Sequence, residues 1–169
     1  MSHLRKLQLS FVLFVSWIAI SSILLFYSGN RHFGSFAFDL PWQAEALSFQ
    51  DLGFTATGPV QLVHVFDEHC VCNTKALAHI DKLNNNNSLV GVGQHFITPA
   101  TLSLSGFMLP ATPAVLIFID GQLKYAGPYA SGVMCSVDES LIMPILKQQV
   151  ILPGLWLNGE STTCRCART

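Results

Sequence analysis

The sequence predicts an α/β domain, with a mixed sheet and flanking helices, preceded by one N-terminal transmembrane helix. The first observation is an uncharged, apolar stretch near the N-terminus that is long enough to cross a bilayer. The second is an order of strand, helix and strand further along the chain, which implies a parallel crossover. The third is the Asp120-Gly121 pair between two strand-like runs, which is a preferred hairpin turn. Together they indicate parallel and antiparallel strands in one sheet.

Residues 9–27 are apolar apart from a few serines, and a bilayer core takes about 20 such residues as a helix. Arg5 and Lys6 precede this stretch, which predicts that residues 1–8 are cytoplasmic and that the rest of the chain lies outside. We interpret residues 9–27 as an uncleaved signal anchor. The alternative is a cleaved signal peptide, for which Ser35-Phe36-Ala37 is a late candidate site.

Composition narrows the class of protein. The chain is half hydrophobic, which excludes a disordered protein, and its net charge of -1 argues against a nucleic-acid partner, which requires a basic face. All five cysteines follow the apolar stretch and therefore lie where disulfides persist. Because five is odd, at least one cysteine is free or pairs outside the chain.

Turn signals divide the rest of the chain into three parts. Residues 28–57 are expected to form a juxtamembrane connection, with a short helix after Pro41. Gly58-Pro59 marks a turn, and the domain covers residues 58–150. A cysteine-containing tail, residues 151–169, follows.

Periodicity predicts the elements of the domain, since buried strands are nearly continuous apolar runs and helices repeat every three to four residues. The expected strands are residues 60–66, 88–93, 114–119 and 122–126. The expected helices are residues 73–83, a weaker one at 101–109, and a last one that Ser136 and Glu139 begin with a capping box and that Pro144 kinks or divides.

The candidate site is the turn between the first strand and the first helix, which carries Cys70 and Cys72. A thiol at a helix N-terminus lies where the partial positive charge of the helix favours the thiolate. A protonated His69 would add to this effect, and Asp67 and Glu68 would oppose it. His64, inside the first strand, is interpreted as a core or strand-edge histidine.

This order of elements resembles the thioredoxin superfamily over about residues 58–150, with cysteines at the first strand-to-helix turn and Thr112-Pro113 before the third strand. The resemblance implies that Cys70 is the nucleophilic cysteine, that Cys72 stands in for the resolving one, and that Thr112 and Pro113 are the threonine and cis-proline that pack against the redox pair.

More closely, the chain is similar to an uncharacterised bacterial, membrane-anchored thioredoxin-like family. The shared features are the Cys-x-Cys turn, Gly127-Pro128-Tyr129, a further cysteine (Cys135) and the Cys164-Arg165-Cys166 tail. This resemblance implies a single-pass protein of the cytoplasmic (inner) membrane, with the C-terminal domain in the periplasm.

The cysteine spacing departs from the Cys-x-x-Cys of thioredoxin by one residue. A disulfide between Cys70 and Cys72 would close a small ring that needs a bent backbone, and strained disulfides are the labile, oxidising ones. The spacing therefore favours thiol–disulfide exchange over a permanent staple.

The predicted function is that of a thiol–disulfide oxidoreductase that acts on protein thiol or disulfide substrates and uses an unidentified redox partner and no cofactor. One alternative is a non-catalytic binding or assembly module, in which Cys70 and Cys72 form separate disulfides with Cys135, Cys164 or Cys166. Another is copper(I) binding by the two cysteines and His69, with His95 if its loop folds back. The tail pair, Cys164 and Cys166, either relays electrons or pins the tail.

Overall fold

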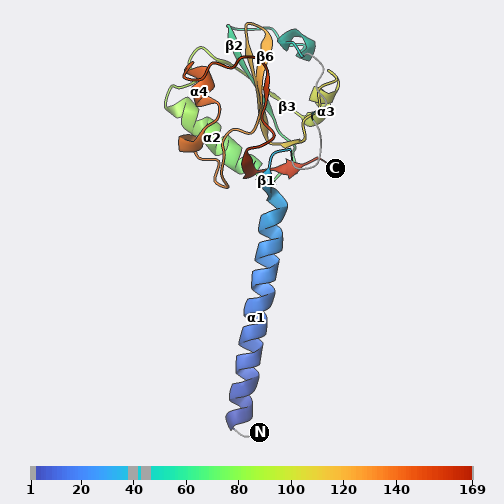
Figure 1. Ribbon diagram of the computed structural model, residues 1–169, viewed down its shortest axis with the longest axis vertical. Helices are drawn as coiled ribbons and strands as arrows, with labels where there is room; N and C mark the ends of the chain where they lie inside the picture. The colour runs from blue at the N-terminus through green and yellow to red at the C-terminus, as the bar shows by residue number, and fades with distance from the viewer. Residues whose placement is uncertain (1–2, 38–41, 43–46, 169) are drawn as a thin grey trace. The chain divides into compact units, whose positions relative to one another are not determined.

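The computed structural model describes residues 3–37, 42 and 47–168, and the chain divides after His32 into two compact units. The elements are α1 (His3–His32), β1 (Phe33–Ser35), η1 (Phe49–Leu52), β2 (Val60–Val65), α2 (Asn73–Asn85), β3 (Gly93–Ile97), α3 (Pro99–Ser103), β4 (Ala111–Thr112), β5 (Ala114–Ile119), β6 (Gln122–Gly127), η2 (Val137–Glu139), α4 (Met143–Leu146), β7 (Trp156–Leu157), β8 (Thr162–Cys164) and β9 (Cys166–Ala167) (Figure 1).

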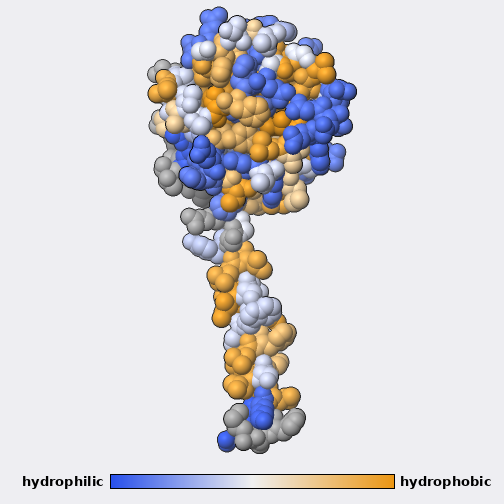
Figure 2. All heavy atoms as spheres, turned by 180° about the vertical axis from the view of Figure 1, so that it is seen from behind, coloured by the Kyte–Doolittle hydropathy of each residue, from blue (hydrophilic) through white to orange (hydrophobic). Residues whose placement is uncertain are grey.

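The first unit is the helix α1, and its segment Arg5–Tyr27 is long and apolar enough to cross a membrane. None of the most apolar part of this segment is buried inside the protein. Apolar side chains therefore follow the helix along its exposed surface, as Figure 2 shows in orange. A helix that is apolar all round needs an apolar surrounding, which a bilayer supplies.

The second unit is built on a five-stranded mixed sheet with the strand order β3-β2-β5-β6-β7. β2 and β3 are parallel and are joined by α2, as the strand–helix–strand order predicts. β5 runs antiparallel to β2 and continues through the Asp120-Gly121 turn into β6, which confirms the predicted hairpin. The sheet is therefore of mixed direction, and the expected strands at 60–66, 114–119 and 122–126 are confirmed.

Each face of the sheet is covered by its own apolar cluster, because β2 and β5 alternate their side chains between two buried faces. α2 and α4 cover one face and α3 lies on the other (Figure 1). On the face of α2 the cluster includes Leu62, Ala76, Ile80, Leu83, Val115, Ile117 and Ile145. On the opposite face it includes Phe36, Phe49, Val63, Val65, Leu102, Phe107, Leu116 and Phe118.

The strand expected at residues 88–93 is wrong. Residues 86–91 form turns after α2, in which Asn87 and Gly91 adopt positive φ angles of 54° and 79°. The strand begins at Gly93 instead and pairs with β2 through Gly93–Ile97. This strand lies at the edge of the sheet, where polar residues such as Gln94 and His95 are tolerated. It therefore lacks the continuous apolar run by which a buried strand is recognised.

Two helices also differ from the expectation. α3 begins earlier than residue 101, because the Thr98 side chain accepts a hydrogen bond from the Thr101 amide and Pro99 occupies the first turn. It ends at Ser103, so the rest of the helix expected at residues 101–109 is not formed. The last helix is divided into η2 and α4, and Pro144 lies in the first turn of α4, where its missing N–H costs no hydrogen bond. Ser136 caps the amide of Asp138 rather than that of Glu139.

The segments on either side of the expected domain contribute to the fold. Phe36 and Phe49 are buried in the core, and the tail supplies β7, β8 and β9. β8 pairs antiparallel with β1, so the start of this unit lies beside its end. The short helix expected after Pro41 falls mainly on residues 41 and 43–46, outside the described residues.

Leu116 and Leu104 form a matched pair for testing this core, because the first is fully buried and the second is 88% exposed. We expect Leu116→Ala to lower the free energy of unfolding by about 2–5 kcal/mol, since it opens a cavity. Leu104→Ala should lower it by less than about 0.5 kcal/mol. Urea unfolding of the full chain in detergent micelles, followed by near-UV circular dichroism, measures both. Equal losses would contradict the position of Leu116 in the core.

Candidate functional site

The turn after β2 holds Cys70 and Cys72 in place through backbone and side-chain hydrogen bonds. The carbonyl oxygen of Asp67 accepts hydrogen bonds from the Cys70 amide at 3.0 Å and from the Asn73 side chain at 2.6 Å. The Asp67 carboxylate accepts one from the His69 amide at 2.9 Å. Cys72 is the N-cap residue of α2. The two cysteines therefore lie at the helix start, as the sequence predicts.

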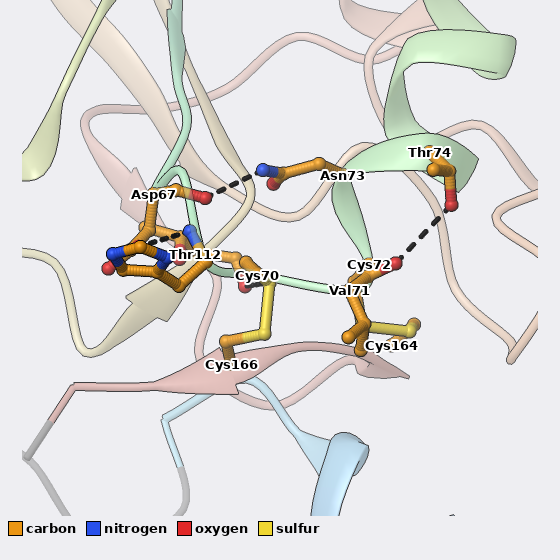
Figure 3. The surroundings of a disulfide bond; sticks show 10 residues. Asp67, Cys70, Val71, Cys72, Asn73, Thr74, Thr112, Cys164 and Cys166 are labelled. Atoms are coloured by element: carbon orange, nitrogen blue, oxygen red, sulfur yellow. Dashed lines mark hydrogen bonds between the residues drawn. A yellow bond between two sulfur atoms is a disulfide. The ribbon is translucent and has the colours of Figure 1, made fainter.

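Both cysteines are bonded to the tail and not to each other. Cys70 forms a disulfide with Cys166, and Cys72 forms one with Cys164 (Figure 3). The Cα atoms are 5.7 Å apart in each pair, which is the common separation for a disulfide. Of the pairings that the sequence left open, the structure therefore holds separate bridges to Cys164 and Cys166.

The tail reaches the turn because its two short strands pair with two others. β8 pairs with β1 and places Cys164 opposite Phe33. β9 pairs antiparallel with β4, with Cys166 opposite Thr112. The Arg168 amide donates a further hydrogen bond of 3.0 Å to the Pro110 carbonyl oxygen. Backbone pairing thus brings the tail cysteines beside the turn.

Thr112 and Pro113 lie directly beside Cys70. Both residues are buried, and the peptide bond that joins them is cis. The Cys70 Sγ atom is 3.5 Å from the Thr112 carbonyl oxygen (Figure 3). The structure therefore brings together Cys70, Thr112 and Pro113, the residues that the resemblance singles out, and adds Cys166 to them.

The sulfur atoms form one cluster. The Sγ atoms of Cys70, Cys72 and Cys166 all lie within 4.8 Å of one another, and Cys164 is bonded to Cys72. Among the described residues, neither His69 nor His95 belongs to this group of potential metal ligands. A hydrogen bond of 3.0 Å joins His95 Nε2 to the Gln61 side chain instead. Such a cluster can exchange disulfides internally, and its thiolates could hold a metal ion once reduced.

Access to the cluster is from the side of the tail. Cys70 and Cys72 are buried, with exposed fractions of 6% and 1%, whereas Cys164 and Cys166 are half-buried. An open depression of about 380 Å³ adjoins the turn. Its lining residues are Phe66, Asp67, Glu68, His69, Thr98, Pro99, Ala100 and Arg168.

A buried polar pair lies in β2 and in the segment after β6. His64 is fully buried, and a hydrogen bond of 2.8 Å joins its Nδ1 atom to the Tyr129 hydroxyl. The His64 ring also stacks on Phe96 at a centroid distance of 4.6 Å. Burial lowers the pKa of His64 to about 4, because the charged imidazolium is disfavoured away from water. His64 is therefore a neutral core residue near neutral pH, in agreement with its interpretation as a core or strand-edge histidine.

Cys135 is separate from the disulfides and is buried. Burial raises the pKa of its thiol to about 11, since the thiolate is disfavoured there. Its carbonyl oxygen is hydrogen-bonded to His79 Nδ1 at 2.9 Å. A thiol with so high a pKa is a poor nucleophile, so Cys135 does not belong to the reactive group.

Sequence reasoning named Cys70, Cys72, Thr112 and Pro113 as candidates, which the structure places together, and missed which tail cysteine pairs with which. One available signal was the equal spacing of the two Cys-x-Cys pairs, which lets two antiparallel segments match cysteine to cysteine. Sequence reasoning also missed the hydrogen bond between His64 and Tyr129. No local pattern predicts it, because the two residues lie 65 positions apart.

Comparison with known proteins gives one family. The model of a family described as a domain of unknown function (DUF6436) matches residues 41–168, and the chain belongs to this family. No curated protein matches the chain. No solved structure matches it either.

The low pKa of His64 predicts a loss of stability in acid. As the pH falls from about 6.5 to 4, the unfolded chain binds a proton at this position that the folded chain does not bind. We expect this difference to remove roughly 2–3 kcal/mol of unfolding free energy between about pH 7.5 and about pH 4.5. In His64→Gln the loss between these pH values should be smaller by that amount.

Urea unfolding of the full chain in micelles at the two pH values measures the effect. The control is His69→Gln, because His69 is exposed. An identical pH dependence in the wild type and in His64→Gln would refute the role assigned to His64.

Proposed function

We propose that this protein is a membrane-anchored thiol–disulfide oxidoreductase that works through Cys70. The observation that carries this proposal is the cysteine cluster itself: Cys70 Sγ lies 3.5 Å from the Thr112 carbonyl and within 4.8 Å of the sulfur atoms of Cys72 and Cys166. Sulfur atoms at such distances need little movement to exchange partners.

The fold supports a thioredoxin-like assignment of the domain. The cysteines follow β2 at the start of α2, the parallel pair of β2 and β3 adjoins the β5–β6 hairpin, and a cis-proline precedes β5. This is the arrangement that the resemblance to the thioredoxin superfamily implies. Fold likeness alone does not establish an activity, so the proposal depends on the cluster.

The proposed reaction transfers two electrons and two protons. In the reduced protein, the Cys70 thiolate attacks a substrate disulfide, forms a mixed disulfide and releases one substrate thiol. Cys166, or Cys72, then attacks the Cys70 sulfur, so that the protein disulfide forms and the second substrate thiol leaves. The dithiol of the protein is oxidised and the substrate disulfide is reduced. The same steps in reverse start from the disulfides of this structure and oxidise a substrate dithiol.

The location follows from α1. With the apolar residues 9–27 in the cytoplasmic membrane, Arg5 and Lys6 before them favour a folded unit on the periplasmic side, where disulfides persist. The substrates are then thiols or disulfides of periplasmic or membrane proteins. A separate redox partner restores the starting state after each cycle.

One observation favours a second candidate, copper(I) binding by the reduced chain. The three clustered sulfur atoms within 4.8 Å of one another are soft ligands that suit this ion. His69 is not in the group, so the set of ligands would differ from the one expected from the sequence. Disulfide formation uses up these thiols, so this function requires the reduced protein.

The exchange proposal is tested by comparing Cys70→Ser with Cys135→Ser in an assay of insulin disulfide reduction. We expect Cys70→Ser to fall to the rate measured without protein, because the nucleophile is lost. Cys135→Ser should stay within about twofold of the wild type, because a buried thiol of high pKa does not take part. Full activity in Cys70→Ser would refute the assignment. An inactive wild type would favour a binding or assembly module with structural disulfides.

The copper proposal predicts that the fully reduced full chain binds copper(I) in competition with a chromophoric chelator. Cys166→Ser should weaken binding by more than about tenfold, because a thiolate ligand is removed. Cys135→Ser again serves as the control, since Cys135 lies outside the cluster. Binding that survives the loss of Cys166 unchanged would exclude this site.

A further inference from the structure

The last residues of the chain are held in two ways beside Cys70. Cys166 is bonded to Cys70, and β9 pairs antiparallel with β4. The Arg168 amide donates to the Pro110 carbonyl oxygen at 3.0 Å. An extended segment that adds to a strand edge and is joined to a reactive cysteine through its own cysteine has the form of a trapped mixed disulfide.

We propose that residues 110–112 form a docking edge for an extended, cysteine-containing polypeptide, and that residues 166–168 of the chain occupy this edge as an internal substitute. The inference rests on the exchange function proposed above and names the form of its substrate. The substrate cysteine takes the position of Cys166, and its flanking backbone pairs with β4. While the tail is bound, it covers the edge and Cys70 together.

The two strands of the tail, β8 and β9, differ in how firmly they are held. This difference allows β9 to detach while β8 stays paired. β8 pairs over three residues with β1, and the Gly132 amide donates to the Thr162 carbonyl oxygen at 2.8 Å. Arg165, the residue after β8, is buried. By contrast, β9 pairs over two residues, and Ala167 is exposed. Short pairings with exposed residues open at little free-energy cost, so β9 can separate while β8 stays in place.

The depression beside the turn adds a preference in charge. Arg168 lines it together with Asp67 and Glu68. A basic side chain two positions after the substrate cysteine would occupy the place of Arg168, in the same depression as these two carboxylates. Charges near the protein surface bias selection and encounter more than they add affinity. The expected substrate segment is therefore Cys-x-Arg or Cys-x-Lys in an extended conformation.

Displacement of the tail needs no net oxidation. The thiolate of an incoming cysteine attacks the Cys70 sulfur, the Cys70–Cys166 bond breaks, and a Cys70–substrate disulfide forms. The incoming thiol gives up its proton to solvent, and the Cys166 thiolate takes one. One disulfide replaces another, and the backbone of the substrate takes the place of the tail in the pairing with β4.

The test uses a peptide of residues 160–168 with Ser in place of Cys164, activated at its remaining cysteine with a thionitrobenzoate group. The protein is the full chain in micelles with Cys72, Cys164 and Cys166 replaced by Ser. Release of thionitrobenzoate reports formation of the Cys70–peptide bond. We expect the peptide to react about three- to tenfold faster than one carrying Arg168→Pro, which lacks the amide that donates to Pro110.

A peptide with Arg168→Glu should also be slower than the native peptide, because it places a third carboxylate beside Asp67 and Glu68. Equal rates for the native and the Arg168→Pro peptides overturn the docking edge. A small aromatic disulfide reagent that reacts readily with Cys70 in the same preparation shows that the exchange function survives this result. Failure of Cys70 to react with the small reagent as well overturns both proposals.

A second measurement avoids the substitutions, in case the triple variant does not fold. The wild-type chain is incubated with millimolar reduced peptide, because the tail competes at a high effective concentration. Mass spectrometry of proteolytic fragments then counts Cys70–peptide disulfides. At least threefold more conjugate with the native peptide than with the Arg168→Pro peptide is expected. Equal amounts refute the proposal.

Discussion

The two disulfides between the turn after β2 and the end of the chain hold the site together. The disulfide between Cys72 and Cys164 joins residues 92 positions apart. In the chain-entropy model it lowers the entropy of the unfolded chain and so stabilises the fold by about 4–5 kcal/mol. Once that disulfide has formed, the disulfide between Cys70 and Cys166 closes only a short ring. It therefore adds only about 2 kcal/mol of stabilisation. Either bridge can therefore open, while the other remains, with a small loss of stability. Two bridges in parallel thus combine a firmly held tail with one bond that is available for exchange.

Behind this cluster the sheet supplies a rigid support. β2 is covered on both faces, and the Tyr129 hydroxyl is hydrogen-bonded to His64, one of its two buried polar side chains. A neutral histidine with one ring nitrogen hydrogen-bonded can occupy a core at less cost than a charged one. Near neutral pH, β2 is therefore held rigidly in the core, and the turn that carries Cys70 begins at a well-defined position.

The sequence predicted the parts of the fold that depend on local pattern. The strands β2, β5 and β6 and the helix α2 followed from apolar runs and helical spacing, and Cys70 and Cys72 followed from their place at the helix start. β3 was misplaced because an edge strand with Gln94 and His95 carries no apolar signature. The equal spacing of the two Cys-x-Cys pairs fits either order of pairing, so the choice between them, over 96 and 92 positions, is decided by tertiary structure. The tail strands are only two or three residues long, too short for any periodicity to appear.

The pairing of β1 with β8 has a consequence for where the cysteines can work. Cys164 lies opposite Phe33, and only six residues follow the end of the apolar segment at Tyr27 up to that position. Even fully extended, six residues span about 20 Å. With α1 in a bilayer, Cys164 is therefore tethered within that distance of the lipid headgroups. Under the proposed exchange function, this short covalent tether would favour partners that are themselves anchored in the membrane over partners dissolved in bulk solution.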